Sequence, residues 1–133
     1  MPTHRQWPIT DDLAALREHI QRYAAEAGLT GTRLDDLVIA ANEAAINVLE
    51  HGGGVGTLAI WRDDASVAVE VVDNAGLLSP ADVPRDQPPG RGNRGYGLWL
   101  INRLCDAVSV DQSPGRSRIR LSIRLAAPAR TNV

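Results

Sequence analysis

The sequence predicts a two-layer α+β sandwich, in which helices cover one face of a mostly antiparallel sheet. Two helical patterns come first in the chain, and two pairs of strand-like runs follow them. The 133 residues suffice for one domain with a hydrophobic core and are too few for two ordinary domains. We therefore expect a single domain over 1–133, with a core from about 7 to 125 and a frayed tail at 126–133.

Two amphipathic helices are predicted in the N-terminal half. The first begins after Thr10, a favoured N-cap residue, and ends at Gly28, where a C-terminal glycine is favoured. The second begins near Thr32 or Leu34 and ends at the triple glycine 52–54. Apolar residues recur at helical spacing in both, so each helix is expected to bury one face in a common layer.

Four alternating or apolar runs predict two antiparallel hairpins. The first hairpin pairs residues 57–62 with 66–73 through a tight turn that contains two aspartates. The second hairpin pairs 107–111 with 117–125 through a turn at 113–115. Together the two hairpins supply the sheet layer of the predicted sandwich.

The segment 77–95 interrupts this pattern. It is dense in proline, glycine and arginine and has neither strand nor helix periodicity. A stretch of this length inside a compact domain is either disordered or a functional lid, and we interpret it as a lid. A short helix is predicted next, opened by Gly97 and Leu98 and ending near Leu104.

Composition excludes several classes of protein. The formal charge of −2 and the isoelectric point near 5.9 provide no basic field for binding nucleic acid. No apolar run approaches the roughly 18 residues that a membrane span needs, and the N-terminus has no signal-peptide core. We expect a soluble, cytoplasmic protein without a membrane partner. The single cysteine excludes an internal disulfide and a cysteine-rich zinc site.

Three polar residues stand where the second helix should be apolar. Glu43, Asn47 and His51 are spaced by four, so they share one face of a helix over two turns. Such a row is usually the solvated face of a helix. Here, however, Asn47 is a poor helix former and occupies a position that suits an apolar residue, which favours a functional site.

The surrounding residues are those that a nucleotide site requires. Gly95 and Gly97 leave backbone N–H groups uncovered at the start of a helix, which favours phosphate binding. Asn47 offers an oxygen ligand of the kind that magnesium takes beside phosphates and water. Glu43, one turn away, can accept a proton from an attacking hydroxyl. Asp73 ends a strand, although an Asp-Asn pair also commonly begins a turn.

These motifs, in this order, resemble the GHKL ATP-binding superfamily, which has the Bergerat ATPase fold. Within this superfamily, the chain is similar over about residues 7–125 to a short single-domain form, the RsbW-type anti-sigma-factor serine kinases. IAANEAAINVLEHG matches the N box, and RGYGLWLINRLCDAVSV the second glycine box. VVDNAG and PGRSRIRL match the first glycine box and the last strand pair more loosely.

The resemblance implies a role for each matched residue. Glu43 would be the catalytic base, Asn47 the magnesium ligand, and Asp73 the acceptor for the adenine amino group. Ser117 matches a position near the adenine, and the role of His51 is less certain. Further positions of the two glycine boxes are expected to contact ATP: Ala75, Gly76, Arg94, Gly95, Tyr96, Gly97 and Leu98.

The resemblance also implies partners. Members of this family bind a sigma factor and phosphorylate a serine or threonine of a STAS-domain anti-sigma factor antagonist, and they are commonly homodimers. The expected cofactors are ATP and Mg²⁺, and the expected activity is that of a protein serine/threonine kinase.

The first glycine box departs from the family pattern. Alanine and leucine, Ala75 and Leu77, stand where the pattern usually has glycine, and Arg116 stands where it often has glycine before Ser117. A branched side chain resists positive φ and fills space that the ligand needs. A regulatory binding module without kinase turnover is therefore the alternative function. A detached sensor-kinase ATP domain ranks last, since no dimerisation helix with a phosphoacceptor histidine is present in the sequence.

Overall fold

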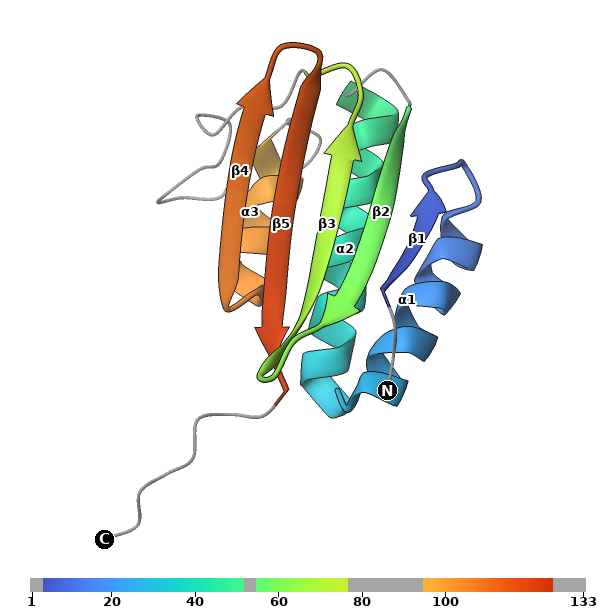
Figure 1. The fold of residues 1–133 in the computed structure, drawn as a ribbon, viewed down its shortest axis with the longest axis vertical. Helices are drawn as coiled ribbons and strands as arrows, with labels where there is room; N and C mark the ends of the chain where they lie inside the picture. The colour runs from blue at the N-terminus through green and yellow to red at the C-terminus, as the bar shows by residue number, and fades with distance from the viewer. Residues whose placement is uncertain (1–3, 52–54, 77–94, 126–133) are drawn as a thin grey trace, which may run out of the picture.

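The structure is a computed structural model, and it describes residues 4–51, 55–76 and 95–125. Within these residues, helices cover one face of a single sheet and leave the other face open (Figure 1). The predicted lid up to residue 94 and the predicted tail at 126–133 lie outside the described residues. The elements, in chain order, are β1 (Arg5–Pro8), α1 (Leu13–Ala27), α2 (Gly31–His51), β2 (Gly56–Arg62), β3 (Ser66–Asp73), α3 (Gly95–Leu104), β4 (Ala107–Ser113) and β5 (Arg116–Arg124).

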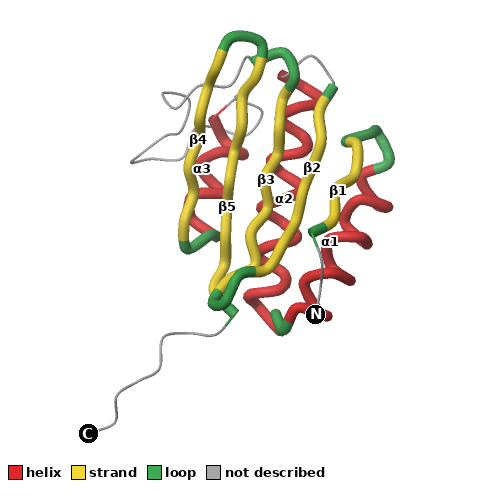
Figure 2. Tube along the Cα trace, viewed as in Figure 1, coloured by secondary structure: helices red, strands yellow, loops and turns green. Residues whose placement is uncertain are grey.

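The strands described form an antiparallel sheet in the order β1-β2-β3-β5-β4 (Figure 2). Both predicted hairpins are present, as β2 with β3 and β4 with β5. β3 and β5 join them into one sheet, and the three helices pack on the same side. The predicted two-layer α+β fold is therefore confirmed.

Strand β1 is an element that the sequence pattern did not predict. Its four residues pair with β2, with Trp7 opposite Leu58. The Trp7 ring stacks on His19 of α1, with ring centroids 4.8 Å apart and 7° between the planes. A four-residue strand that ends in proline is too short to show an alternating pattern, so the tertiary contact with α1 is its main signal.

Helix boundaries differ from the predicted ones by a few residues. The N-cap of α1 is Asp12, whose Oδ1 accepts a hydrogen bond from the Ala15 N–H at 3.1 Å, so the predicted Thr10 cap is wrong. Thr10 instead accepts a hydrogen bond from the Asp12 N–H. Gly28 ends α1 in the left-handed conformation at φ 116°, as predicted. α2 and α3 begin earlier than expected, at Gly31 and Gly95.

The second hairpin is longer than predicted. Ser113 and Arg116 pair as the last residues of the ladder, so Pro114 and Gly115 alone form the turn. β5 consequently begins one residue earlier than expected and ends at Arg124.

The hydrophobic core lies between the helices and the sheet. α1, α2 and α3 contribute their apolar stripes, and alternate residues of β2, β3 and β5 contribute the facing side chains. Cys105 lies at the margin of this core, and burial raises the pKa of its thiol to about 12. The largest fully buried side chains are Ile20, Leu29, Leu37, Leu58, Ile60, Leu98, Ile101, Ile119, Leu121, Ile123, Val67 and Val69.

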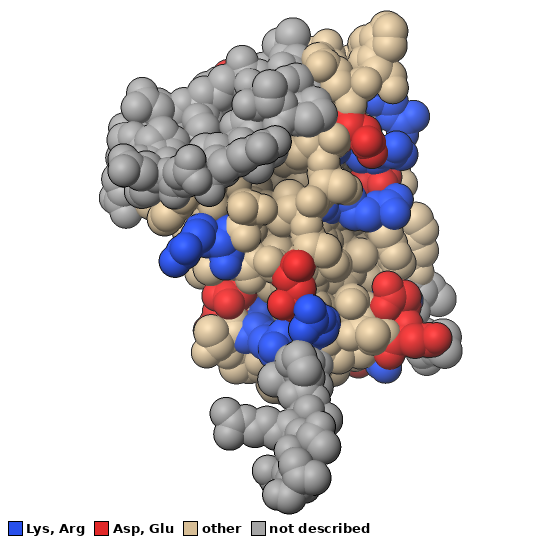
Figure 3. Space-filling view, turned by 90° about the vertical axis from the view of Figure 1, so that its left-hand side faces the viewer, with Lys and Arg blue, Asp and Glu red and all other residues tan. Residues whose placement is uncertain are grey.

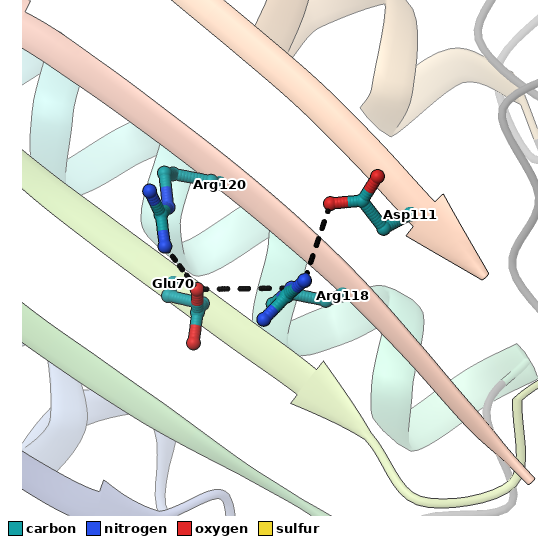
Figure 4. A network of polar contacts seen from close by, with 4 residues as sticks. All are labelled: Glu70, Asp111, Arg118 and Arg120. Carbon is teal, nitrogen blue, oxygen red and sulfur yellow. Dashed lines mark hydrogen bonds and ion pairs between the residues drawn. The ribbon is translucent and has the colours of Figure 1, made fainter. Parts of the chain in front are cut away.

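Long charged side chains cover the open face of the sheet. Glu70 accepts a hydrogen bond from Arg120 at 2.9 Å and forms an ion pair with Arg118 at 3.8 Å. Arg118 also contacts Asp111 at 3.4 Å, which links three strands across this face (Figure 4). The Arg120 guanidinium lies 5.2 Å from the centroid of the Trp61 ring. Basic and acidic side chains are interspersed on the side of the molecule that carries β4 (Figure 3).

No helix within the described ranges 4–51, 55–76 and 95–125 is long and apolar enough to cross a membrane.

Candidate functional site

The polar row of α2 lies against the first turn of α3. A Cβ added to Gly97 would be 3.0 Å from Glu43 Oε1 and 3.5 Å from Asn47 Nδ2. Glycine at this position thus allows the start of α3 to approach both polar side chains closely. The structure brings together three residues that the sequence analysis placed in one site, and it does so across two helices.

Asn47 carries an unsatisfied polar atom. Its Nδ2 is buried, and it has no hydrogen-bond partner among the described residues. An unpaired buried polar group costs about 1–3 kcal/mol, so native proteins rarely keep one without a reason. A side-chain amide can rotate to present either its oxygen or its nitrogen. The Asn47 amide is therefore a candidate to bind a ligand.

Burial also perturbs Glu43. The carboxyl group is half-buried, and its desolvation raises the pKa of Glu43, with a further contribution from the negative charge of Glu50. A raised pKa makes the carboxylate a better proton acceptor. The group beside the amide of Asn47 thus has the property that a general base requires.

A second group of polar residues lies at one end of the sheet. In the antiparallel register, Gly56 of β2 is opposite Asp73, Asp73 is opposite Ser117, and Ser117 is opposite Gln112. The side chains of Asp73 and Ser117 share the face of β3 and β5 that packs against the helices. They are 4% and 1% exposed, and they are the buried polar residues of the described chain. Two buried polar side chains on an otherwise apolar face are unusual, which makes this end of the sheet a candidate binding site.

The turn after Asp73 is tightly hydrogen-bonded. The Asp73 Oδ1 accepts from the Ala75 N–H at 2.8 Å, and the Asn74 N–H donates to the Val55 carbonyl at 3.1 Å. Gly76 takes φ +68°, whereas no described residue other than glycine has positive φ. Ala75 therefore occupies its glycine position without backbone strain, because Gly76 supplies the left-handed residue.

Gly56 connects the two groups of residues. A Cβ at this position would be 2.9 Å from Val48 Cγ1 and 2.2 Å from the Val72 carbonyl oxygen. Val48 follows Asn47 on α2, and Gly56 pairs with Asp73. The absence of a side chain therefore lets the α2 segment that carries Asn47 pack directly over the strand ends that carry Asp73.

The remaining predicted site residues have different surroundings. His51 is the last residue of α2, and Gly95 is the first residue of α3. Tyr96 is half-buried, with its ring centroid 6.1 Å from that of Trp99. Leu98 is 2% exposed and belongs to the hydrophobic core. Arg94 lies outside the described residues, and so does Leu77, which departs from the first glycine box.

Sequence reasoning missed Gln112 and Gly56. Gln112 Nε2 donates a hydrogen bond to the Gly76 carbonyl oxygen at 2.7 Å. The only early signal for Gln112 is a polar residue at an inward position of a strand, and the position is inward only once the strand register is known. Gly56 follows the triple glycine at 52–54, from which it cannot be distinguished by composition.

Comparison with protein families identifies the family of the chain. A family model described as "Histidine kinase-like ATPase domain" matches residues 7–123. The chain belongs to this family. The ATPase domain is also similar to the anti-sigma F factor of Clostridium acetobutylicum, with 24% identity over 110 residues, covering 75% of this chain and 76% of that protein.

Two solved structures share the fold of this ATPase domain. A structure of the RsbU and RsbW domains of Rv1364c from Mycobacterium tuberculosis has a TM-score of 0.69 at 22% identity. The match covers 98% of this chain but 33% of the other, so the chain spans a third of that protein's length. The SiaB-SiaC complex from Pseudomonas aeruginosa matches with a TM-score of 0.57 at 17% identity, covering 92% of this chain and 89% of that one. The predicted resemblance to RsbW-type proteins is confirmed.

Proposed function

We propose that this histidine kinase-like ATPase domain binds ATP with Mg²⁺ and phosphorylates a serine or threonine of a STAS-domain anti-sigma factor antagonist. We further propose that it binds a sigma factor, acts in the cytoplasm where ATP is available, and forms a homodimer. The observation that carries the proposal is the convergence of Glu43, Asn47 and Gly97 at the start of α3. The similarity to an anti-sigma F factor supports the proposal that the chain binds a sigma factor.

The residues present fit a divalent ion and a triphosphate. The Nδ2 atom of the half-buried Asn47 side chain is buried and has no hydrogen-bond partner among the described residues. Hard cations such as Mg²⁺ take amide oxygens of this kind as ligands. When bound, the ion would neutralise developing charge on the phosphates. The first turn of α3 contains Gly95 and Gly97 and is the positive end of the helix dipole, and both features favour phosphate binding.

Glu43 is proposed to accept the proton in the transfer step. The hydroxyl oxygen of the protein substrate attacks the γ-phosphorus, and the bond between that phosphorus and the β–γ bridging oxygen breaks. The hydroxyl proton moves to the Glu43 carboxylate, and ADP leaves with the bridging oxygen. At the other end of the site, Asp73 is proposed to accept a hydrogen bond from the adenine amino group, beside Ser117.

Phosphoryl transfer is the direct test. The purified chain is incubated with radiolabelled ATP and a STAS-domain protein from the same genome, with Mg²⁺ or with a chelator. We expect label on a serine or threonine of the STAS protein when Mg²⁺ is present, and no label when the chelator is present. ATP binding without transfer would instead support the regulatory binding module. The absence of ATP binding at millimolar concentration would exclude the kinase and would support a regulatory module whose nucleotide site has degenerated.

The transfer rate should depend on pH through Glu43. The base must be deprotonated, so the rate falls as pH drops through the pKa of Glu43, which burial has raised above the ordinary range of a glutamate. Glu50→Gln removes a negative charge that contributes to this shift, so it should move the acid limb of the pH–rate profile to lower pH.

Glu26→Gln is the matched control, because it makes the same charge change at the other end of the helical layer, in the last turn of α1. Its acid limb should coincide with that of the wild-type chain. Equal displacement by both variants would mean that net charge, and not the neighbour of Glu43, sets the profile.

Gly97→Ala should separate stability from activity. The new methyl group would be 3.0 Å from Glu43 Oε1, so the carboxylate must move by a few tenths of an ångström. Alanine also favours the helix over glycine, by about 0.5–1 kcal/mol. We expect an unchanged or higher melting temperature together with a transfer rate reduced by about tenfold, since a misplaced base loses its alignment. A wild-type rate in this variant would contradict the proposed geometry.

A further inference from the structure

The turn that follows Asp73 is attached to the rest of the protein on both of its sides. On the β2 side, the Asn74 N–H donates to the Val55 carbonyl at 3.1 Å. On the β4 side, Gln112 Nε2 donates to the Gly76 carbonyl at 2.7 Å. Val55 holds the turn through backbone atoms that any residue provides. Among the described residues, Gln112 holds the turn on the β4 side through its side chain, so this attachment depends on a residue with a side-chain donor.

The packing at Gly76 makes this attachment specific. A Cβ on Gly76 would be 2.5 Å from the Arg116 N atom and 2.9 Å from the Gly115 carbonyl carbon. The turn therefore rests directly on the backbone at the β4–β5 connection. With φ at +68°, Gly76 directs its carbonyl oxygen to the end of β4, where Gln112 lies in register with Ser117.

The position of Gly76 contributes to the orientation of the Asp73 carboxylate through the residue before it. Ala75 precedes Gly76, and its N–H group holds Asp73 Oδ1 at 2.8 Å. If the Gly76 carbonyl is released, the peptide groups of the turn can rotate and carry the Ala75 N–H group with them. Gln112 thus acts on Asp73 through the turn, without touching the carboxylate itself.

Resting on the ATP-binding function proposed above, we infer that Gln112 is a positioning residue that holds the turn at 73–76 in the shape that selects adenine over guanine. The amino group of adenine donates a hydrogen bond to a carboxylate, whereas guanine presents a carbonyl oxygen at the equivalent ring position and repels it. A carboxylate held in one orientation therefore discriminates the two bases, and a carboxylate released from it discriminates less.

Three variants separate this role from simple stabilisation of the fold. Gln112→Glu keeps the shape of the side chain but replaces the donor with an oxygen that repels the Gly76 carbonyl. Gln112→Lys restores a donor, and the open hollow lined by Gly76, Ser113, Pro114 and Gly115 has room for the longer chain. Ser113→Ala is the control, since it changes the adjacent residue on the opposite face of β4.

The experiment measures the dissociation constants of ATP and GTP by calorimetry, with Mg²⁺, for the wild-type chain and each variant. We expect Gln112→Glu to weaken ATP binding by about tenfold and GTP binding by less than about twofold, as the loss of one well-placed hydrogen bond allows. Gln112→Lys should retain most of the preference for ATP, and Ser113→Ala all of it. Melting temperatures are recorded for every variant.

An unchanged ratio of ATP to GTP affinity in Gln112→Glu would overturn the inference. So would a parallel loss for both nucleotides with a lower melting temperature, because that is the signature of a purely structural residue. If the wild-type chain itself does not bind ATP, the proposed function fails instead, and the two failures are therefore distinguishable.

Discussion

Glu43→Gln is expected to reduce phosphoryl transfer by about 10²–10⁴-fold while leaving the affinity for ATP and Mg²⁺ close to that of the wild-type chain. The substitution preserves the size and shape of the side chain and removes its ability to accept a proton. The Glu43 carboxylate lies beside the first turn of α3, where the phosphates of ATP are proposed to bind, so the substitution should slow the chemical step. Single-turnover transfer and calorimetric ATP titration measure the two quantities separately.

Stability provides a second readout for this variant. Burial raises the pKa of Glu43, so the folded state holds the proton more tightly than the unfolded state does. Stability from this group is present at low pH and is lost as pH rises through the two pKa values. Above its pKa the Glu43 carboxylate is charged and partly desolvated, and the neutral glutamine removes that desolvation cost. The melting temperature of Glu43→Gln at pH 7 should therefore equal or exceed that of the wild-type chain.

Glu50→Gln is the matched control for the transfer experiment, since it makes the same chemical change on the same helix. At a pH above the acid limb of the measured profile, its transfer rate should be close to that of the wild-type chain. A Glu43→Gln protein that transfers phosphate at the wild-type rate would show that another group accepts the proton.

The sequence was sufficient to predict the elements with strong local signals. The helix over Gly31–His51 has an apolar stripe and a glycine stop, and the hairpins have alternating runs joined by turn residues. Boundary errors arose where two adjacent residues have the same local preference. Thr10 and Asp12 are both good N-cap residues, and only the hydrogen bond to the Ala15 N–H distinguishes them.

The candidate site was predictable in proportion to how local it is. Glu43 and Asn47 share a helix face because of their spacing alone. Their close approach to Gly97 depends on how α3 packs against α2. The resemblance to the family had already placed Gly97 in the same site as these two residues. The role of Gln112 depends on the pairing of β3 with β5 and of β5 with β4. Neither register can be read from the residues of one strand, because non-local pairing is decided by the whole core.

Asn47→Ala is expected to abolish the Mg²⁺-dependent part of ATP binding and, at the same time, to stabilise the free protein. The amide is the proposed oxygen ligand, so its removal should weaken ATP binding in Mg²⁺ by about 100-fold, to the level seen with a chelator. The buried Nδ2 atom has no hydrogen-bond partner among the described residues, and alanine removes that unsatisfied group from the helix. Alanine is also the better helix former, so the free energy of unfolding should rise by about 1 kcal/mol.

Asn42→Ala is the matched control, because it makes the same substitution on the same helix at a position with a different contact. Asn42 Oδ1 accepts a hydrogen bond from Arg17 Nη1 at 3.2 Å, which joins α2 to α1. Its loss should lower the free energy of unfolding slightly and leave Mg²⁺-dependent binding intact. Opposite changes in the free energy of unfolding, together with a loss of Mg²⁺-dependent binding in Asn47→Ala alone, would identify Asn47 as a residue kept for its ligand. Replacing a purely structural asparagine would instead lower the free energy of unfolding. Tight ATP binding by Asn47→Ala in Mg²⁺, or a marked loss of its stability, would contradict the assignment of Asn47 as the metal ligand.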